Sequence, residues 1–344
     1  MEGMEMKVLV TGNLGYNGCP VVELLEKQGH EVVGIDTEYF KSNFMSLANS
    51  APTKQLSCDI REIQEEQLSG IDAVVHLAAL SNDALGEIDK SLTDEINFKA
   101  SVRLAKLAKK AGAIKFIYAS SCSVYGISDP SQYATETSPL NPLTAYAKAK
   151  INTEKEIEKL HDDHFTIVNM RNATMHGVSP KLRLDLVVNN LVASAYIYDK
   201  IKILSDGTPW RPLLSVSDFA NFIHLFLKKE KPSHITYNIG FTKENYRILE
   251  LGNIISQITG AEVDVNKNKT PDERSYRVSF ERLESEFGED PIDDVPSSVK
   301  KLKLAYEENG LSEDIFNSSK YFRIRTLKEL INNGSLNHEL KWAK

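Results

Sequence analysis

The chain has 344 residues, of which 41% are hydrophobic and 26% charged, and its formal net charge at pH 7 is −7. These values are ordinary for a globular protein of one or two domains, and no apolar run approaches the length that a membrane span needs. The negative net charge, with no cluster of Lys and Arg, argues against a protein that binds nucleic acid along its phosphate backbone.

The chain begins with MEGMEMKVLV, which lacks the long apolar stretch and the cleavage site of a secretory signal. The cysteines, Cys19, Cys58 and Cys122, do not have the paired spacing that zinc and redox sites use. We therefore expect a cytoplasmic protein with reduced thiols, no metal site and no contact with membranes.

Short runs rich in Val and Ile alternate with longer segments of helical periodicity in the first half of the chain. This alternation predicts successive βαβ units on a parallel sheet. The expected strands are 7–11, 31–35, 73–77, 114–119 and 166–170, and the expected helices are 19–28, 92–111 and 144–160.

The pattern is less regular after about residue 172. Helices are expected at 185–198, 217–228 and 247–259, short strands near 202–204 and 213–216, and a last amphipathic helix that ends at Asn333 and Gly334. The predicted fold class is α/β. A Rossmann-type doubly wound parallel sheet would occupy residues 1–172, with some later segments returning to it, and a smaller α+β lobe with a helical tail would occupy residues 173–344.

The segment TGNLGYNG directly follows the first expected strand and places Gly12, Gly15 and Gly18 in the spacing GxxGxxG. Glycines there allow a tight turn and a close approach of the backbone to a pyrophosphate at a helix N-terminus. Asp36, at the end of the second strand, can accept hydrogen bonds from both ribose hydroxyls, and no Arg follows it to neutralise a 2′-phosphate. The pattern predicts a dinucleotide site that favours NAD over NADP.

Tyr146 and Lys150 are four residues apart in an expected helix, so their side chains project from the same face. A nearby ammonium favours the phenolate form of a tyrosine and lowers its pKa toward neutrality. With a serine from the cluster at 120–123 to hold the substrate oxygen, such a set suffices for reversible alcohol oxidation without a metal.

These motifs together resemble the extended short-chain dehydrogenase/reductase family, in its NAD-dependent nucleotide-sugar epimerase/dehydratase branch, with UDP-glucose 4-epimerase as the nearest type. TGNLGYNG is similar to the family's TGxxGxxG, HLAA to its fourth-strand motif, SSCSVYG to its SSxxVYG element and YAKAK to its YxxxK. The resemblance implies an NAD-binding domain and a substrate-binding lobe. The implied NAD contacts are Gly12, Asn13, Leu14, Gly15, Tyr16, Gly18, Asp36, Asp59, Ile60, Leu77, Ala78, Ala79, Asn97, Tyr146 and Lys150.

The same resemblance assigns the catalytic roles by position. Ser121 takes the place of the catalytic Ser or Thr, Tyr146 that of the acid or base, and Lys150 that of the residue that lowers the pKa of Tyr146 and binds the nicotinamide ribose. Tyr125 is expected to be mainly structural or to line the pocket. The implied contacts to a nucleotide-diphosphate sugar are Ser81, Ser121, Ser123, Thr174, Asn190, Arg211 and Arg274, with Lys269 as the alternative to Arg274.

The two positions after Ser121 narrow the reaction. A 4,6-dehydratase of this family carries an Asp-Glu pair there, whereas this chain has Cys122 and Ser123, so elimination of water is disfavoured. Asp36 fits a cofactor that is reduced and reoxidised within one cycle. We therefore expect an NAD-dependent nucleotide-sugar epimerase that acts through a transient keto sugar. An NAD(H)-dependent nucleotide-sugar 4-ketoreductase or dehydrogenase stays open, a non-catalytic NAD-binding regulator is less favoured, and the sugar, the nucleobase and the carbon attacked are left open.

The resemblance further implies a homodimer in which the helices expected at 92–111 and 144–160 form a four-helix interface.

Overall fold

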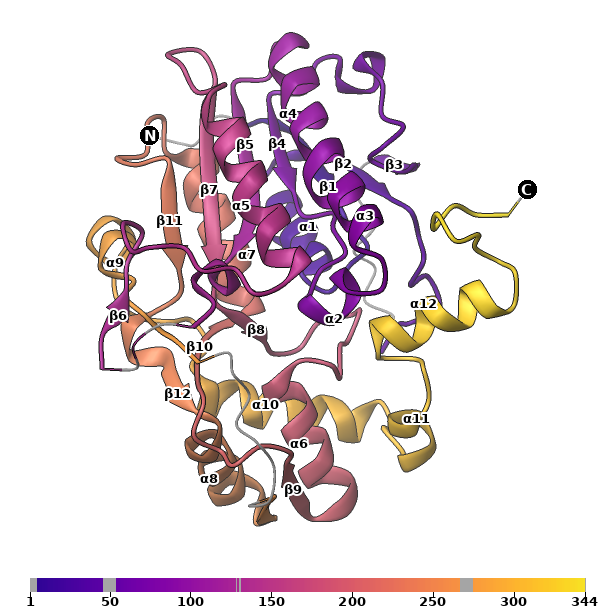
Figure 1. The fold of residues 1–344 in the computed structure, drawn as a ribbon, viewed down its shortest axis with the longest axis vertical. Coiled ribbons are helices and arrows are strands. Elements are labelled where there is room, and N and C mark those ends of the chain that lie inside the picture. The colour runs from indigo at the N-terminus through magenta and orange to yellow at the C-terminus, as the bar shows by residue number, and fades with distance from the viewer. Residues whose placement is uncertain (1–4, 46–53, 128, 130, 267–274, 344) are drawn as a thin grey trace.

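The computed structural model describes residues 5–45, 54–127, 129, 131–266 and 275–343. Within these residues the main sheet has seven parallel strands in the order β11-β7-β5-β4-β1-β2-β3 (Figure 1). Its strands are β1 (Lys7–Thr11), β2 (Glu31–Asp36), β3 (Lys54–Ser57), β4 (Ala73–His76), β5 (Lys115–Ser121), β7 (Thr166–Asn172) and β11 (Thr236–Ile239). This sheet confirms the predicted Rossmann-type α/β class.

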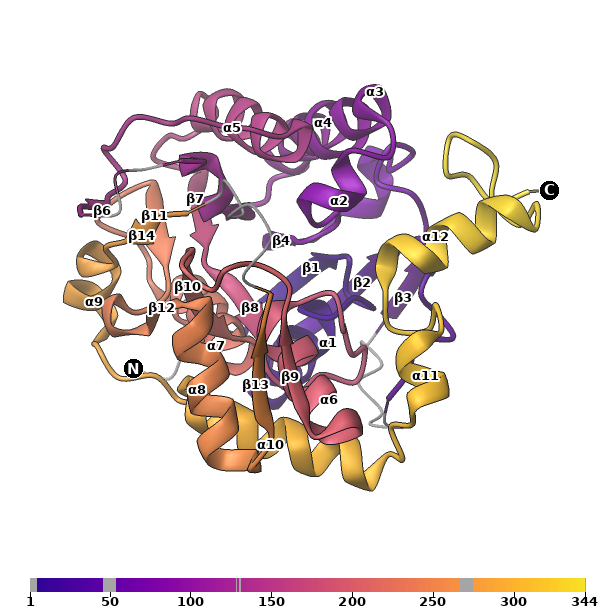
Figure 2. The ribbon, with the colours of Figure 1, turned by 60° about the horizontal axis from the view of Figure 1, so that its bottom comes forward.

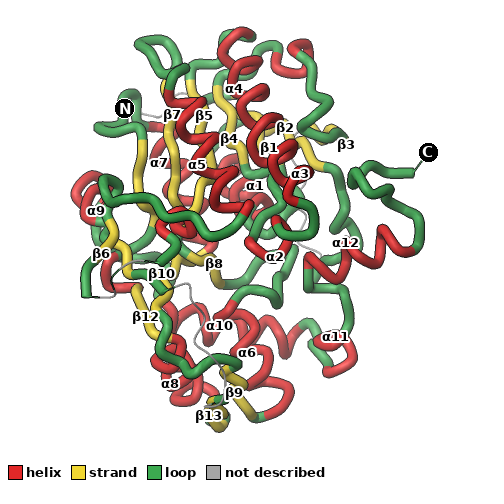
Figure 3. The backbone as a smooth tube through the Cα atoms, in the orientation of Figure 1, coloured by secondary structure: helices red, strands yellow, loops and turns green. Residues whose placement is uncertain are grey.

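Helices cover both faces of the sheet, as the tube view shows (Figure 3). On one face α1 (Gly18–Lys27) packs beside α7 (Val216–Lys228), and on the other α4 (Ser101–Lys110) lies beside α5 (Ala145–Glu158) (Figure 2). Strand β1 supplies both cores because its side chains alternate: Val8 and Val10 pack with α1 and α7, whereas Leu9 packs in the cluster with α4 and α5.

The helix expected at 92–111 is interrupted. Short helix α3 (Lys90–Thr93) leads into a π-helical segment, η2 (Asp94–Ala100), before α4 begins. The carbonyl oxygen of Asn97 accepts hydrogen bonds from the Ser101 and Thr153 hydroxyls, at 3.0 and 2.9 Å. These hydroxyls take the acceptor that the Ser101 N–H would use in a regular α-helix, so the backbone widens there.

The smaller lobe lies beyond the carboxyl ends of the sheet strands, in the lower half of Figure 1. It contains a sheet ordered β12-β10-β8, a pair β13-β9, and a core formed with α6, α8 and α10. The bounds are β8 (Thr174–His176), α6 (Val187–Tyr198), β9 (Lys200–Ile203), β10 (Trp210–Ser215), β12 (Asn245–Arg247), α8 (Ile248–Thr259), β13 (Glu262–Val265) and α10 (Val295–Glu308).

Several shorter elements complete the described chain. They are η1 (Glu65–Leu68), α2 (Asp83–Gly86), η3 (Cys122–Tyr125), β6 (Tyr133–Ala134), η4 (Thr242–Glu244), β14 (Arg277–Val278), α9 (Glu281–Phe287), α11 (Glu313–Asn317) and α12 (Arg323–Asn332). Although β11 and α7 come late in the sequence, they belong to the main sheet and its helical layer. Helix α12 lies near α2 and the end of the sheet that carries β2 and β3 (Figures 1 and 2).

Candidate active site

Within the described residues, two neighbouring cavities open at the carboxyl ends of the sheet strands, where ligands bind in open α/β sheets. The larger, of about 670 Å³, lies between the sheet and the smaller lobe. The smaller, of about 150 Å³, follows the turn after β1. They share wall residues, among them Tyr16, Ala119 and Arg183, so a ligand in one would reach the other.

The turn after β1 has the shape of a phosphate cradle. Gly12 has φ +71°, and a Cβ atom there would lie 2.8 Å from the Ala78 backbone nitrogen. A Cβ atom on Gly18, at the start of α1, would lie 2.3 Å from the Gly12 carbonyl oxygen. Side chains are therefore excluded from both positions, which leaves the backbone and the helix N-terminus facing the cavity.

Asp36 stands at the end of β2 and lines the smaller cavity. Its carboxylate accepts hydrogen bonds from the backbone N–H groups of Leu14 and Glu38, at 3.1 and 2.8 Å. Burial nevertheless raises the pKa of this carboxyl, against the lowering effect of those hydrogen bonds and of Lys181. The two N–H donors fix the carboxylate in one orientation at the cavity wall.

Most of the residues expected to hold a dinucleotide do line the smaller cavity. They are Gly12, Gly15, Tyr16, Gly18, Asp36, Asp59, Ile60, Leu77, Ala78 and Ala79.

The structure places three others behind the wall, in supporting positions. Asn13 donates to Gln55, and the Leu14 N–H to Asp36, at 2.7 and 3.1 Å. The Asn97 side chain bonds both the N–H and the carbonyl of Leu80, at 2.8 and 3.1 Å. Asp59 itself reaches the cavity, but its carboxylate already forms an ion pair with Arg61 at 2.7 Å.

Ser121, Tyr146 and Lys150 meet at the wall of the larger cavity. Ser121 ends β5, and its hydroxyl accepts the Ser123 N–H at 3.2 Å. Tyr146 lies in the first turn of α5, which Thr144 caps, and hydrogen-bonds with Ser121. The Lys150 ammonium nitrogen lies one turn further on, 5.5 Å from the centroid of the Tyr146 ring, and donates to the Ala119 carbonyl at 2.6 Å.

The pKa values at this site differ from the sequence-based expectation. The pKa of Tyr146 is raised, chiefly by burial and then by the Asp83 charge, while the Ser121 hydrogen bond and Arg183 act in the lowering direction. Burial also lowers the pKa of Lys150 to about 7, opposed by Glu154. Burial thus opposes charge on both groups. The expected role of Lys150, to lower the pKa of Tyr146, stays a prediction.

A buried ion pair lies behind the carboxyl end of β5. Arg171 binds the Glu154 carboxylate at 2.7 Å, and Glu154 also accepts the Ser120 hydroxyl. Arg171 donates to the Tyr125 hydroxyl at 3.2 Å, which in turn donates to Asn238 at 2.6 Å. Tyr125 is thus buried in a polar network and lines neither cavity, which leaves the structural alternative of the two expected for it.

The two positions after Ser121 point in different directions. The Cys122 thiol is buried, donates to the Arg171 carbonyl at 3.0 Å and has a raised pKa because of its burial. Ser123 lines the larger cavity, and its hydroxyl has no hydrogen-bond partner among the described residues. Cys122 therefore belongs to the core, whereas Ser123 belongs to the wall of the larger cavity.

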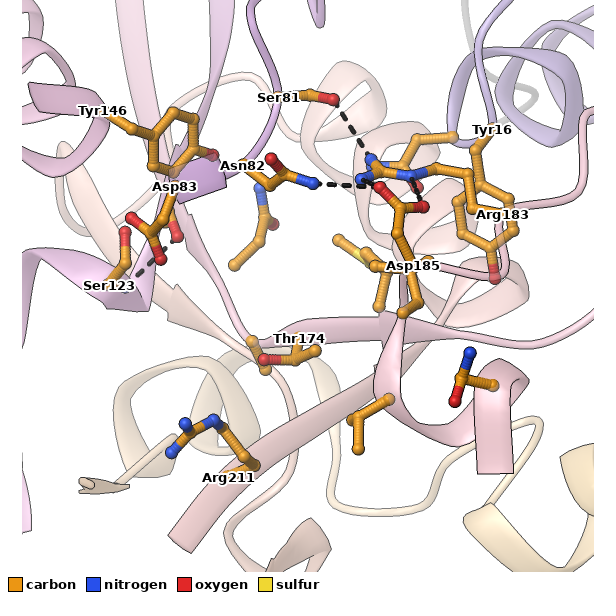
Figure 4. Close-up of a pocket in the computed structure, with 18 of the residues that line it drawn as sticks. Tyr16, Ser81, Asn82, Asp83, Ser123, Tyr146, Thr174, Arg183, Asp185 and Arg211 are labelled. Atoms are coloured by element: carbon orange, nitrogen blue, oxygen red, sulfur yellow. Dashed lines mark hydrogen bonds and ion pairs between the residues drawn. The ribbon is translucent and has the colours of Figure 1, made fainter. Parts of the chain in front are cut away.

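The other residues expected to contact a substrate lie around the same cavity. Ser81, Thr174, Asn190 and Arg211 all line it, from four separate segments of the chain. Figure 4 labels Ser81, Thr174 and Arg211 among them. The Asn190 amide donates to the Leu184 carbonyl at 2.8 Å, and an Arg211 nitrogen donates to the Trp210 carbonyl at 2.8 Å. Arg274 and its alternative Lys269 lie outside the described residues.

Comparison with known proteins identifies the family. The model of the NAD-dependent epimerase/dehydratase family matches residues 8–240. The chain belongs to this family.

The proteins to which this chain is similar are named for different reactions. A Bacillus subtilis protein, the uncharacterized UDP-glucose epimerase YtcB, is 29% identical over 272 residues, which cover 74% of this chain and 83% of that protein. UDP-glucuronic acid decarboxylase 1 of Arabidopsis thaliana is 22% identical over 321 residues, 90% of this chain and 72% of the relative. The solved structure of TunA, an NAD-dependent NDP-hexosamine 5,6-dehydratase, has a TM-score of 0.77 at 20% identity and covers 88% of this chain and 98% of that one.

This member of the epimerase/dehydratase family is accordingly an NAD-dependent enzyme of the extended short-chain dehydrogenase/reductase type, as expected. The smaller cavity fits that cofactor: the glycine turn leaves room for a diphosphate, and Asp36 offers a fixed carboxylate to a ribose. Its relatives include proteins named as an epimerase, a decarboxylase and a dehydratase, so family membership does not define the reaction.

Sequence reasoning missed a charged pair at the junction of the two cavities of this family member. Arg183 binds the Asp185 carboxylate through two nitrogens, at 2.9 and 2.8 Å, and donates to the Ser81 hydroxyl at 3.1 Å (Figure 4). The Asn82 amide donates to the same carboxylate at 3.0 Å. The available signal was the segment KLRLD at 181–185, in which charged residues alternate with two fully buried leucines.

The described residues were also compared with what a metal site and a membrane span require. Among the described residues of this enzyme, no group of His, Cys, Asp and Glu side chains is arranged to hold a metal ion. His176 is buried, and burial lowers its pKa to about 4, so its imidazole is neutral near pH 7. The described part of the chain also contains no helix long and apolar enough to span a membrane.

Proposed function

We propose that this enzyme is an NAD-dependent nucleotide-sugar epimerase. The observation that carries the proposal is the position of Ser121, Tyr146 and Lys150. They meet on the wall of the larger cavity, near the residues that line both this cavity and the smaller one. A sugar held in the larger cavity would thus face both a proton-transfer group and the dinucleotide. NAD supplies the chemistry of accepting a hydride from a sugar carbon and returning it.

In this proposal Tyr146 exchanges the proton of the sugar hydroxyl, and Ser121 hydrogen-bonds the same oxygen and orients it. Both the Tyr146 phenol and the Lys150 amine are buried. Forming a phenolate and an ammonium together therefore costs less desolvation free energy than forming either charge alone. With a pKa of about 7, Lys150 can gain a proton as Tyr146 loses one. The pair then takes up one proton when the sugar hydroxyl is oxidised and returns it when the keto sugar is reduced.

We disfavour dehydration because the two positions after Ser121 offer no acid or base to the cavity. Cys122 is turned into the core, and its thiol has a raised pKa, while Ser123 presents a hydroxyl. The carboxylates that do line the cavity are engaged: Asp83 accepts the Thr144 hydroxyl at 2.6 Å, and Asp185 is paired with Arg183. An NAD(H)-dependent 4-ketoreductase or dehydrogenase uses the same set of residues and is the second outcome that the experiment must separate.

The test is to incubate the purified protein and NAD with UDP-, dTDP-, GDP- and CDP-sugars in D₂O and to follow the products by NMR. Epimerase activity would invert one hydroxyl without net formation of NADH. Accumulation of NADH, or consumption of added NADH with a keto sugar, would indicate a dehydrogenase or ketoreductase, and a deoxy-keto product would indicate a dehydratase. Either result would overturn the proposal.

The matched control is Tyr146→Phe, which keeps the ring and removes the hydroxyl. Turnover should fall by about 100-fold or more, as expected for a lost acid-base group, while the Kd for NAD stays within about twofold. Equal turnover in the variant and the parent would contradict the assigned role of Tyr146.

We also propose that the enzyme binds its nucleotide-diphosphate sugar through Ser81, Ser123, Thr174, Asn190 and Arg211.

We further propose that the enzyme is a homodimer. The surface formed by α4, η2 and α5 supports the dimer, because Phe98, Val102 and Leu107 lie there in a shallow depression among basic side chains. Light scattering during size-exclusion chromatography tests it, and a monomer at micromolar concentration would refute it.

A further inference from the structure

The carboxyl-terminal segment, residues 318–343, forms part of the wall of the smaller cavity, which is called the dinucleotide cavity below. Two side chains of α12, Arg323 and Leu327, line this cavity together with Gly12, Gly15 and Asp36. Leu327 is buried in the same hydrophobic cluster as the strand residues Leu9 and Ile35. The segment is therefore anchored on the NAD-binding half of the molecule, as its position in Figure 2 shows.

Arg323 is an unusual side chain to find at this depth, because only 2% of its surface is exposed. One guanidinium nitrogen donates to the Lys181 carbonyl at 2.8 Å, and the guanidinium carbon lies 4.5 Å from the centroid of the Phe40 ring. The other terminal nitrogen, Nη1, has no hydrogen-bond partner among the described residues, and none of their carboxylates forms an ion pair with this arginine.

A buried arginine without an anionic partner is costly, because desolvation opposes its charge. Burial, and then the positive charge of Arg183, lower the pKa of Arg323 to about 9. Arg183 is already neutralised by Asp185, whereas Arg323 is not paired in this way. The cavity wall carries the carboxylates Asp36 and Asp59 and the guanidinium groups of Arg183 and Arg323. Because Arg323 forms no ion pair with a carboxylate among the described residues, an anionic ligand beside the glycine turn would offset the cost of its burial.

The residues after α12 hydrogen-bond to Thr37 and Tyr39, which line another part of the cavity. The Trp342 indole N–H donates to the Thr37 carbonyl at 2.7 Å, and the Tyr39 hydroxyl donates to the Leu340 carbonyl. Arg61, the partner of Asp59, donates to the Glu339 carbonyl at 2.9 Å. These contacts hold the segment over the region that follows Asp36, on the side where the adenosine of a dinucleotide would lie.

We propose that Arg323 binds the diphosphate of NAD and that residues 318–343 form the outer wall of the NAD site. A guanidinium is suited to this ligand because its planar fork can donate two hydrogen bonds to phosphate oxygens. The proposal rests on the NAD dependence of the family and not on the epimerase reaction.

The experiment measures binding by isothermal titration calorimetry, with the full chain freed of NAD, for three ligands: NAD, ADP-ribose and adenosine. Arg323→Gln should weaken NAD and ADP-ribose by about tenfold or more, since a charge-assisted contact is lost, and leave adenosine within about twofold. Arg323→Lys keeps the charge without the fork and should lie between the parent and Arg323→Gln. The matched control is Arg325→Gln on the same helix, whose guanidinium bonds the Asn317 and Ser318 carbonyls and does not line the cavity.

Two results would overturn the proposal. The first is unchanged affinity of Arg323→Gln for NAD and ADP-ribose. The second is an equal loss for all three ligands, which would show that Arg323 only holds α12 in place. If Arg323→Gln does not fold, Arg323→Lys decides the question by the same comparison of ADP-ribose with adenosine. Because no sugar nucleotide enters these titrations, failure of the epimerase assignment would leave their outcome intact.

Discussion

The buried amine of Lys150 permits a quantitative prediction about stability. Its pKa is lowered from 10.5 to about 7, with burial as the main cause, and the side chain is only 4% exposed. Each pKa unit corresponds to about 1.4 kcal/mol of difference between the folded and the unfolded chain. Burying the charged form therefore costs the folded protein about 5 kcal/mol at a pH where the amine is protonated in both states.

The sign of the pH dependence follows from the direction of this change. Below about pH 7 both states hold the proton and the full cost applies, whereas between pH 7 and 10.5 the folded state has released it and the cost declines. Lys150→Met removes the charge and keeps an unbranched side chain. The stability that Lys150→Met gains over the parent, measured as the increase in the free energy of unfolding, should be larger at pH 6 than at pH 9 by about 3 kcal/mol.

The assay is urea unfolding of both proteins without NAD at pH 6 and at pH 9, with similar m-values as the condition for the comparison. Lys148→Met is the matched control, because Lys148 is exposed on the same helix. Its stability relative to the parent should change little between the two pH values. If the free energy of unfolding of Lys150→Met differs from that of the parent by the same amount at pH 6 and at pH 9, the reasoning about the buried amine is refuted.

Three further substitutions test other parts of the site. Gly18→Ala places a Cβ atom 2.3 Å from the Gly12 carbonyl and should weaken NAD binding by about tenfold or more in calorimetry; unchanged affinity would show that the turn can relax. Glu154→Gln leaves Arg171 charged and buried without its partner, so urea unfolding should show a loss of about 3 kcal/mol, and a loss below about 1 kcal/mol would contradict a strong pair. Asp36→Ser removes the carboxylate that would repel a 2′-phosphate and should improve NADP binding relative to NAD; an unchanged ratio would mean that other groups discriminate.

The sequence predicts the parts of the fold and site that depend on local patterns. Strand β1 and helix α5 were predictable because Val-rich runs and the YxxxK spacing are local, and the carboxyl ends of parallel strands bring distant motifs together. Helix α10 carries a recognisable start signal, Asp294 as N-cap followed by proline, and was nevertheless missed.

Other features could not be foreseen from local patterns because they depend on tertiary contacts. The π-helical widening at Asn97 depends on the hydroxyl of Thr153, which lies 56 residues away. The pKa of Lys150 depends on the degree of burial, which a sequence motif does not report. Arg323 lines the cavity beside the glycine turn and donates to the carbonyl of Lys181, which lies 142 positions earlier in the chain, and no spacing rule connects these residues.

The contact between Trp342 and Thr37 spans 305 positions of the chain and joins the carboxyl-terminal wall to the loop after β2. A ribosome therefore releases the glycine turn and Asp36 long before it releases the residues that cover them. Until those residues are synthesised, Arg323 and Leu327 are missing from the wall of that cavity. The wall can therefore be completed only when nearly the whole chain is available.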